Sequence, residues 1–297
     1  MEPISFALAL AGIPGVFTAC IQCYQHIQFG REFESDFELT WCKLEAAELR
    51  LARWGASMGI EGPESKLSAD DYSEQEATMA YHWLSEIQRS FNSAFEISSR
   101  YGKTAKPDKL QLLDTEQQLR KGSGALQAVH SHIRGCIDKR IKPRKRDRIS
   151  WAIYRKGAFQ NLIETISSLV DNLIELFPAK LETQKQLCGD EVRDLDVDSL
   201  ALLDKAAGDD DTMLQAILRI EAQQRPNFYT NIEVRDYFTG HFGDNVASTG
   251  PSRSAVYSNI RAGGHAVAHF GNNVGNYQGK TVYSLERGNN EGLGDRG

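Results

Sequence analysis

Residues 162 to 178 read LIETISSLVDNLIELFP, and this stretch predicts the architecture of most of the chain. Its apolar side chains recur every three or four residues, which is the spacing of one face of an α-helix. Pro178 ends the pattern, because proline cannot continue a helix. Such a helix buries one face against its neighbours. The apolar positions are Leu162, Ile163, Ile166, Leu169, Val170, Leu173, Ile174 and Phe177.

The same spacing recurs on both sides of this stretch. It predicts helices over roughly residues 34–58, from Ser73 onward, over 114–141, and shorter ones near 198–207 and 211–222. Ser73 and Glu76 have the spacing of a capping box, which starts a helix. No alternating strand pattern interrupts these segments, so the sequence predicts an all-α helical bundle. The helical stripes are Phe37, Trp41, Leu44, Glu48 and Leu51; Met79, Trp83, Ile87, Phe91 and Phe95; and Leu119, Leu126, Val129, Ile133 and Ile137.

The composition changes near residue 225 of the 297-residue chain. The last 73 residues hold 12 of the 25 glycines, two leucines and none of the four tryptophans. The net charge of −6 divides into −7 for residues 1–224 and +1 for residues 225–297. Neither part has the basic excess of a nucleic-acid-binding protein. We therefore expect a globular domain over 1–224, followed by a segment, 225–297, that cannot build an ordinary core.

The amino-terminal segment from Ile4 to Phe29 contains no Asp, Glu, Lys or Arg. A helix of this length can cross a hydrocarbon core of about 30 Å. It is a poor secretory signal, because Glu2 stands where a basic leader is needed. One interpretation is a buried core helix of a soluble bundle; the other is a helix that enters a membrane once released. Small residues every four positions predict close approach to another helix, and they are the candidate membrane-inserting residues: Ala7, Ala11, Gly15, Ala19 and Cys23.

Cysteine and basic residues give weaker signals. Five cysteines without a disulfide framework indicate a reducing compartment, and we expect Cys20 and Cys23 to be buried free thiols. Seven of the ten residues from Lys139 to Arg148 are basic. They are compatible with a solvated loop, with attraction to an anionic membrane surface, or with a nuclear address.

No catalytic motif is evident in the sequence. It contains no Gly-rich phosphate loop, no HExxH and no GxSxG. His82, His130 and His132 are interpreted as structural, and the acidic run Asp209–Asp211 as a solvated turn and helix start. We therefore expect neither an enzyme nor a bound cofactor or metal.

The carboxy-terminal part contains an internal repeat. Residues 229–246 and 257–274 match at eight of eighteen positions with an offset of 28. If each repeat forms one rung of a β-solenoid, equivalent residues stack about 4.8 Å apart. The predicted amyloid core is Asn231, Ile232, Glu233, Phe242, Gly243, Asn245 and Val246, stacked with Asn259, Ile260, Arg261, Phe270, Gly271, Asn273 and Val274.

Two rungs are fewer than the three or so that a solenoid needs to stand alone. Other copies of the segment can supply the missing neighbours, so we expect the tail to be disordered as a monomer and ordered as a polymer. A flexible tail with a relic duplication is an alternative. An aromatic RNA-binding tail is another, but the near-neutral charge argues against it.

Short motifs along the chain carry a family resemblance. They are Glu2-Pro3 with its uncharged run, Cys20-x-x-Cys23, Gly30-Arg31-x-Phe33, Arg50-Leu51-x-Arg53-Trp54-Gly55, Trp151-Ala152-x-Tyr154, Leu176-Phe177-Pro178 and the stretch from Leu200 to Gly208. Their order across the chain is specific. In these motifs, and in its two-repeat tail, the chain resembles the HET-s/HET-S family of fungal heterokaryon-incompatibility prion proteins.

The resemblance implies an α-helical HeLo domain followed by a prion-forming domain that becomes a β-solenoid amyloid. It further implies that folding of the tail disrupts the helical domain, so that the N-terminal helix enters the membrane and the cell dies. The expected partners are further copies of the chain, in an amyloid polymer or as a homodimer of the HeLo domain, together with related prion-forming domains and, on activation, membrane lipid, with no nucleic acid. The expected location is the cytoplasm, and the cell membrane after activation.

Two alternatives to this toxic effector remain open at the level of sequence. A non-toxic prion-like protein would polymerise for self-recognition and regulate a toxic partner without permeabilising membranes. A soluble helical adaptor with a disordered tail would do neither.

Overall fold

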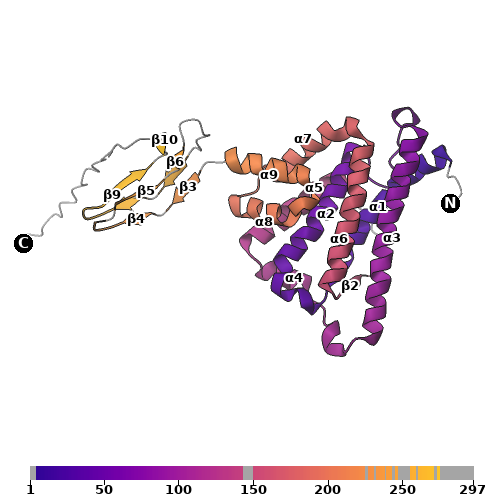
Figure 1. Ribbon diagram of the computed structural model, residues 1–297, viewed down its shortest axis with the longest axis horizontal. Helices are drawn as coiled ribbons and strands as arrows, with labels where there is room; N and C mark the ends of the chain where they lie inside the picture. Colours follow the sequence, from indigo (N-terminus) through magenta and orange to yellow (C-terminus); the bar gives the residue numbers. More distant parts are fainter. Residues whose placement is uncertain are drawn as a thin grey trace, which may run out of the picture. The chain divides into compact units, whose positions relative to one another are not determined.

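The structure is a computed structural model that describes residues 5–142 and 150–224, and beyond them 227–230, 232–237, 239–242, 245–246, 255–258, 260–270 and 273–274. The chain divides into two compact units, Met1–Glu221 and Ala222–Gly297 (Figure 1). The first unit is helical. Its helices are α1 (Phe6–Gln25), α2 (Phe37–Ser57), α3 (Glu74–Thr104), α4 (Thr115–Lys121), α5 (Gly124–Arg140), α6 (Lys156–Leu176), α7 (Leu181–Val192), α8 (Val197–Ala207) and α9 (Thr212–Gln224).

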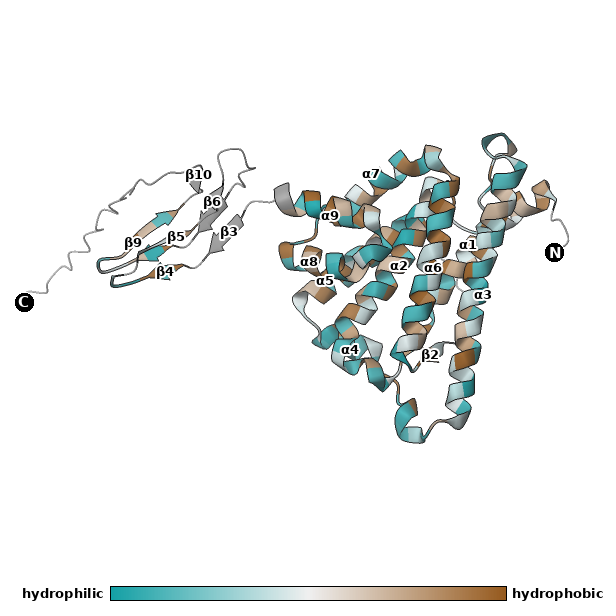
Figure 2. Cartoon of the chain, viewed as in Figure 1, coloured by the Kyte–Doolittle hydropathy of each residue, from teal (hydrophilic) through white to brown (hydrophobic). Residues whose placement is uncertain are grey.

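The α2 helix lies at the centre of the helical unit. It packs on α1, α5, α6, α7 and α8. Trp54 of α2 is fully buried, and its Nε1 donates a hydrogen bond to the carbonyl of Leu173 at 3.2 Å. The α6 stripe predicted from residues 162–177 faces this core, with Leu162, Ile166 and Leu173 buried. Apolar and polar residues accordingly alternate along α3 and α6 (Figure 2).

The predicted helical bundle is confirmed as the architecture of the helical unit, but the unit also contains a small parallel sheet that the sequence pattern did not predict. Strand β1 (Ile27–Phe29) pairs with β2 (Trp151–Ile153), with Ile27 opposite Trp151. Three-residue strands are too short for an alternating pattern to reveal them. The pair fixes the end of α1 to the segment that leads into α6.

The helix boundaries agree only in part with those predicted from the sequence. The capping box of Ser73 and Glu76 is confirmed at the start of α3. The single helix expected over 114–141 is instead α4 and α5, because Ser123 caps a new helix through the Leu126 N–H at 3.1 Å. Phe95, predicted to be in the core stripe, is 45% exposed. The α7 helix was not predicted, since its apolar residues are few.

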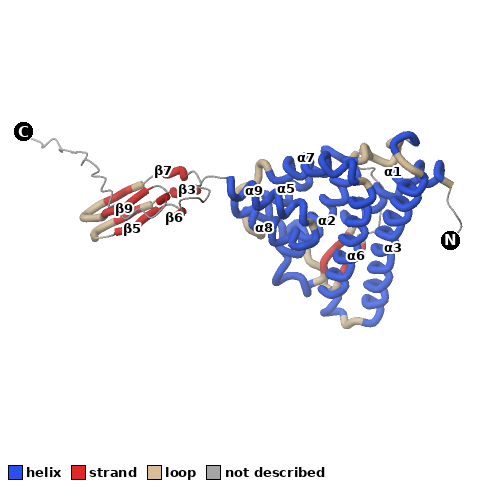
Figure 3. The backbone as a smooth tube through the Cα atoms, turned by 45° about the horizontal axis from the view of Figure 1, so that its top comes forward, coloured by secondary structure: helices blue, strands red, loops and turns tan. Residues whose placement is uncertain are grey.

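The described residues of the second unit form short strands in four parallel pairs. Figure 3 shows β5 and β9 side by side. The pairs are β3 with β7, β4 with β8, β5 with β9 and β6 with β10. Their bounds are β3 (Asn227–Thr230), β4 (Glu233–Val234), β5 (Thr239–Phe242), β6 (Asn245–Val246), β7 (Ala255–Ser258), β8 (Arg261–Ala262), β9 (Val267–Phe270) and β10 (Asn273–Val274).

Candidate functional site

The α1 helix is the first candidate element, and it is docked on the bundle. Its inner face is buried against α3 and α2. Phe17 is fully buried, and the Tyr24 ring meets the Phe91 ring edge-on at a centroid distance of 4.8 Å. Cys20 Sγ donates to the Leu84 carbonyl at 3.3 Å. Cys20 and Cys23 are buried free thiols, as predicted.

The outer face of α1 is exposed and apolar. Among the described residues, α1 is the helix that is long and apolar enough to span a membrane, and only half of its apolar window is buried. Leu8 on this face is 64% exposed. The α1 helix thus has one face that fits the protein core and another that carries no charge.

The small-residue stripe, which holds the candidate membrane-inserting residues, lies mostly on this outer face. Ala7, Ala11 and Gly15 are exposed, Ala19 is half-buried and only Cys23 is buried. The close approach between helices occurs at two other glycines. A Cβ on Gly12 would lie 2.6 Å from the Tyr81 ring, and one on Gly55 would lie 2.1 Å from the Phe17 ring. Small size is therefore needed where an aromatic ring from another helix arrives, which the four-residue spacing does not predict.

A polar cluster holds the carboxy-terminal end of α1. Gln25 Nε2 donates to Glu48 Oε1 of α2 at 3.2 Å, and Arg134 of α5 also binds Glu48. Burial raises the pKa of Glu48, although the Arg134 charge acts against it. His130 Nδ1 lies 2.6 Å from the neighbouring buried carboxylate of Glu45. The histidine expected to be structural therefore lies within an ion cluster between α2 and α5.

A second ion cluster is buried on the opposite side of α2. Arg53 is fully buried, and its Nη2 donates to Glu191 Oε2 at 2.7 Å and to Asp211 Oδ2 at 2.8 Å. Arg50 Nε lies 3.9 Å from Asp211 Oδ1, and Arg50 also pairs with Asp171. On the far side of Glu191, the guanidinium of Arg140 pairs with its carboxylate. This Arg53 cluster joins five segments of the helical unit.

Asp211 corrects an interpretation made from the sequence. The run Asp209–Asp211 does start a helix, because Asp211 Oδ1 accepts from the Leu214 N–H at 3.0 Å in the first turn of α9. Asp211 is not solvated, however, since only 3% of it is exposed. Burial alone would raise its pKa, but the charge and hydrogen bond of Arg53 outweigh burial and hold the pKa below its usual value.

The tail strands pair in a register of 28 residues, which is the offset of the sequence repeat. Glu233 lies opposite Arg261, and Asn245 opposite Asn273. The rings of Phe242 and Phe270 stack at a centroid distance of 5.2 Å with planes 8° apart. The main chain of Arg261 donates to the Ile232 carbonyl at 2.8 Å. Of the predicted core, Asn231, Gly243, Asn259 and Gly271 lie outside the described residues.

The turns of the two repeats also stack, and here glycine is required. Asp236 and Gly264 both have positive φ angles, of 58° and 70°. A Cβ on Gly264 would lie 2.9 Å from the Cα of Asp236. The second turn therefore fits directly on the first only because Gly264 has no side chain.

The basic run from Lys139 to Arg148 is described only in part. Arg140 belongs to the Arg53 cluster, and Lys142 Nζ lies 3.0 Å from Glu61 Oε2 on the surface. The basic residues from Arg144 to Arg148 lie outside the described residues. Of the three basic residues of the run that the structure describes, Arg140 and Lys142 thus have acidic partners.

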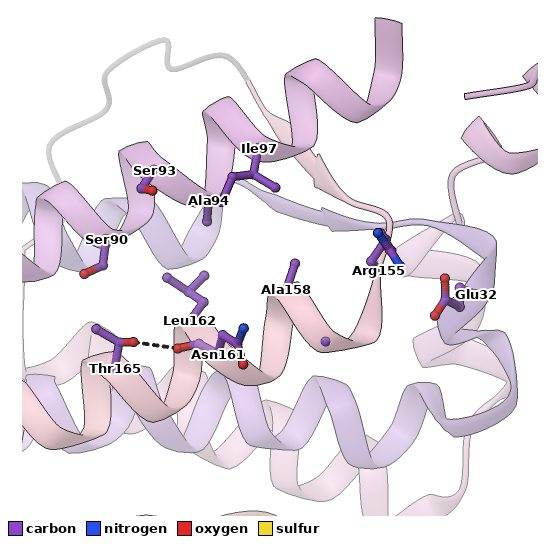
Figure 4. A pocket seen from close by; sticks show the side chains of 11 residues that line it. Glu32, Ser90, Ser93, Ala94, Ile97, Arg155, Ala158, Asn161, Leu162 and Thr165 are labelled. Carbon is purple, nitrogen blue, oxygen red and sulfur yellow. Dashed lines mark hydrogen bonds between the residues drawn. The ribbon is translucent and has the colours of Figure 1, made fainter. Parts of the chain in front are cut away.

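A cavity of about 600 Å³ lies between α3 and α6 (Figure 4). Ala94, Ile97 and Leu162 contribute apolar lining, and Arg155 and Glu32 lie at one end. The residues that line this cavity include no His or Cys, so it offers no nucleophile paired with a histidine base. Within the described part of the chain, no group of three His, Cys, Asp or Glu side chains is placed to hold a metal ion.

The chain is similar in sequence to known proteins, and its helical unit is similar in fold to solved structures. The HeLo family, described as prion-inhibition and propagation, matches residues 5–203. Heterokaryon incompatibility protein S of Podospora anserina is 29% identical over 210 residues, which cover 70% of each chain. Heterokaryon incompatibility protein s of the same organism is 28% identical over 209 residues, again 70% of each chain.

The two solved structures share the fold of the helical unit. The HET-S N-terminal domain has a TM-score of 0.60 and 23% identity, and the match covers 71% of this chain and 94% of that one. A mutant HET-s N-terminal domain has a TM-score of 0.59 and 22% identity, with 71% and 97% covered.

Proposed function

Because this chain belongs to the HeLo family, as its motifs predicted, we propose that it is a heterokaryon-incompatibility effector of programmed cell death. In this proposal the tail polymerises into a β-solenoid amyloid, and the bundle loosens. The α1 helix then leaves the bundle, inserts into a membrane and permeabilises it. The protein acts without catalysis and without a cofactor. It is cytoplasmic before activation and moves to the cell membrane afterwards.

The observation that carries the proposal is the two-sided character of α1. Its 20 residues contain no charged side chain, yet half of its apolar window is buried in a folded domain. A helix that served only the core would have no need of the apolar outer residues Leu8, Ala11 and Gly15. In hydrocarbon, both faces would be surrounded by an apolar medium.

The free-energy cost of moving α1 out of the bundle favours its entry into a membrane over its release into water. Burial of one large apolar side chain contributes about 1.5–3 kcal/mol. Leu10, Ile13, Phe17 and Ile21 are all buried on the inner face, so their exposure to water would cost roughly 6–12 kcal/mol. Insertion into lipid keeps these side chains out of water, so the transfer from core to membrane costs far less than release alone.

The paired strands of the tail support the templating step. Each first-repeat strand pairs in parallel with its second-repeat equivalent, and parallel in-register stacking is the arrangement by which identical chains extend a fibril. The edges of a two-rung unit can then pair with further copies of this chain or with related prion-forming domains. The partners we propose are further copies of this chain, related prion-forming domains and membrane lipid. Nucleic acid is not among them.

A second candidate is a non-toxic prion-like protein that polymerises for self-recognition and regulates a toxic partner. The observation that favours it is the close fit of α1, in which the Phe17 ring occupies the space above Gly55. If that fit survives polymerisation of the tail, α1 stays docked. The two candidates differ in membrane leakage and share fibril formation.

Vesicle leakage tests the proposal. Full-length protein is mixed with dye-loaded vesicles, either neutral or anionic, and seeded with fibrils of residues 225–297. The proposal predicts dye release only in seeded samples. Fibril growth without release from either vesicle type would reject the effector and favour the non-toxic candidate.

A further inference from the structure

One motif of α2 contacts both of the elements that the proposed mechanism must connect. In the run Arg53-Trp54-Gly55, Arg53 binds Asp211 at the start of α9. The next two residues face α1: the Trp54 ring lies 5.9 Å from the Phe17 ring, and Gly55 makes room for that ring. Three consecutive residues of one helix therefore link α9 with α1.

The position of Asp211 makes this link relevant to the tail. Asp211 caps α9, and α9 is the last helix before the first tail strand, which begins at Asn227. Leu214 and Leu218 bury the inner face of α9 in the helical unit. A conformational change that starts in the tail and spreads back along the chain reaches α9 first.

We propose that the Arg53–Asp211 contact is the coupling point through which tail polymerisation loosens α1. This inference rests on the proposed function, and it adds the route by which the signal crosses the helical unit. When α9 unwinds, Asp211 leaves Arg53. The Arg53-Trp54-Gly55 segment then shifts, and the contact of Gly55 with Phe17 is lost.

The charges of the Arg53 cluster explain why the Arg53-Trp54-Gly55 segment must shift when Asp211 leaves. Arg50, Arg53 and Arg140 carry three positive charges, and Asp171, Glu191 and Asp211 carry three negative ones. Because Asp171 is 54% exposed, loss of Asp211 leaves Glu191 as the one buried carboxylate of the cluster facing these three cations, which is unfavourable in a low-dielectric interior. Arg53 has no exposed surface, so its guanidinium reaches water only if α2 moves. The packing of Phe17 on Gly55 cannot accommodate this movement of α2, because the Phe17 ring fills the space that a side chain at position 55 would take.

Asp211→Asn in the full-length protein tests the coupling by hydrogen exchange. Asparagine keeps an oxygen for the Leu214 N–H but removes the charge that faces Arg53. We expect amide exchange in α9 and α1 to rise together, by about tenfold or more relative to α8 as internal reference. Asp209→Asn is the matched control, because it removes the same charge from an exposed residue two positions away. Faster exchange in α9 alone, or in neither helix, would overturn the inference.

A variant at the other end of the route keeps the test decisive if Asp211→Asn does not fold. Coupling between two sites is reciprocal, so loosening α1 must also loosen α9. Phe17→Leu removes the ring from Gly55 and Trp54 while keeping an apolar side chain. We expect faster exchange in α9 as well as in α1, and unchanged exchange in both for Leu8→Ala on the exposed face. Normal α9 protection in Phe17→Leu would contradict the coupling.

These outcomes are separate from those of the proposed function. Exchange is measured without vesicles or seeds, so it reports coupling even if α1 never enters a membrane. If the coupling is right and the proposed function is right, Asp211→Asn also shortens the lag of seeded leakage relative to Asp209→Asn. Coupled exchange with no leakage in any variant would reject the function and leave the coupling intact.

Discussion

The helical unit and the tail achieve order by different means. In the helical unit, unlike residues far apart in sequence meet, as when Arg53 binds Glu191 and Asp211. In the tail, equivalent residues stack on each other, as Phe242 does on Phe270. Val234 is buried in the described tail, whereas Tyr237 is 82% exposed. The helical unit is therefore held by contacts between unlike residues, whereas the described tail is held by pairing of equivalent residues, an arrangement that further copies of the chain would extend if the proposed function is right.

The largest expected effect comes from a variant that disrupts strand pairing in the tail and leaves the helical unit unchanged. Arg261→Pro removes the N–H that donates to the Ile232 carbonyl between the two rungs. We expect loss of fibril formation, measured by dye binding and by the 4.8 Å diffraction spacing of stacked strands. The thermal unfolding of the helical unit should not change. Arg261→Lys keeps both the N–H and the charge, and it should form fibrils normally.

The next variant affects α1 only when the helix enters a membrane. It should change neither the folded helical unit nor the assembly of the tail. Ala11 is exposed on the docked helix, so Ala11→Glu should leave thermal unfolding and fibril growth unchanged. A carboxylate near the centre of a bilayer costs about 2.5–3.5 kcal/mol, so seeded vesicle leakage should be lost. Ala11→Leu is the matched control and should leak like the original protein. Persistent leakage by Ala11→Glu would mean that another segment crosses the membrane.

A third variant breaks the helical unit and spares the tail. Gly55→Ala places a methyl group against the Phe17 ring, and overpacking of this kind costs about 1–3 kcal/mol. We expect a lower midpoint of urea unfolding and earlier leakage after seeding, with normal fibril growth of the tail. Gly15→Ala, where no atom lies within 4 Å of the added group, should not lower the midpoint, because alanine favours the interior of a helix more than glycine does. Equal stability of the two variants would show that α1 docks differently.

The smallest effects concern pH and distinguish two buried carboxylates of the helical unit. The pKa of Glu48 is raised by burial, so the folded helical unit gains stability as the pH falls from neutral toward the ordinary glutamate range of about 4.3. Arg53 lowers the pKa of Asp211 against the effect of burial. Its contribution is therefore complete above the ordinary aspartate pKa of about 3.9, and it is lost as the pH falls through the folded value.

Urea unfolding across this pH range checks both signs. Glu48→Gln should remove the gain in stability that appears as the pH falls toward the ordinary glutamate pKa of about 4.3, and Asp211→Asn should remove part of the loss below about 3.9. An unchanged profile for Glu48→Gln would mean that its carboxylate is not shielded from water as described.

Sequence patterns predicted the features that depend on local spacing. The stripe from Leu162 to Phe177 and the Ser73–Glu76 box predicted α6 and the start of α3. The offset of 28 matches the pairing of Glu233 with Arg261. These features are visible in sequence because each depends on residues a fixed distance apart.

Features that depend on tertiary contacts could not be predicted in this way. Asp211 looked like part of a solvated acidic run, and its burial depends on Arg53, which is 158 residues away. The small-residue stripe of α1 suggested a helix contact, but Gly12 and Gly55 make the close contacts, because Tyr81 and Phe17 happen to project there. A single sequence does not reveal which distant side chain arrives at a given position.

The central claim, that polymerisation of the tail releases α1, is tested most directly by the chemical accessibility of Cys20. This thiol lies on the inner face of α1 and has no exposed surface in the docked helix. Full-length protein is incubated with a water-soluble maleimide, with and without tail fibrils as seeds, and modification of Cys20 is measured by mass spectrometry. The account predicts that Cys20 resists modification before seeding and is modified as the tail polymerises. Polymerised protein in which Cys20 remains protected would contradict it.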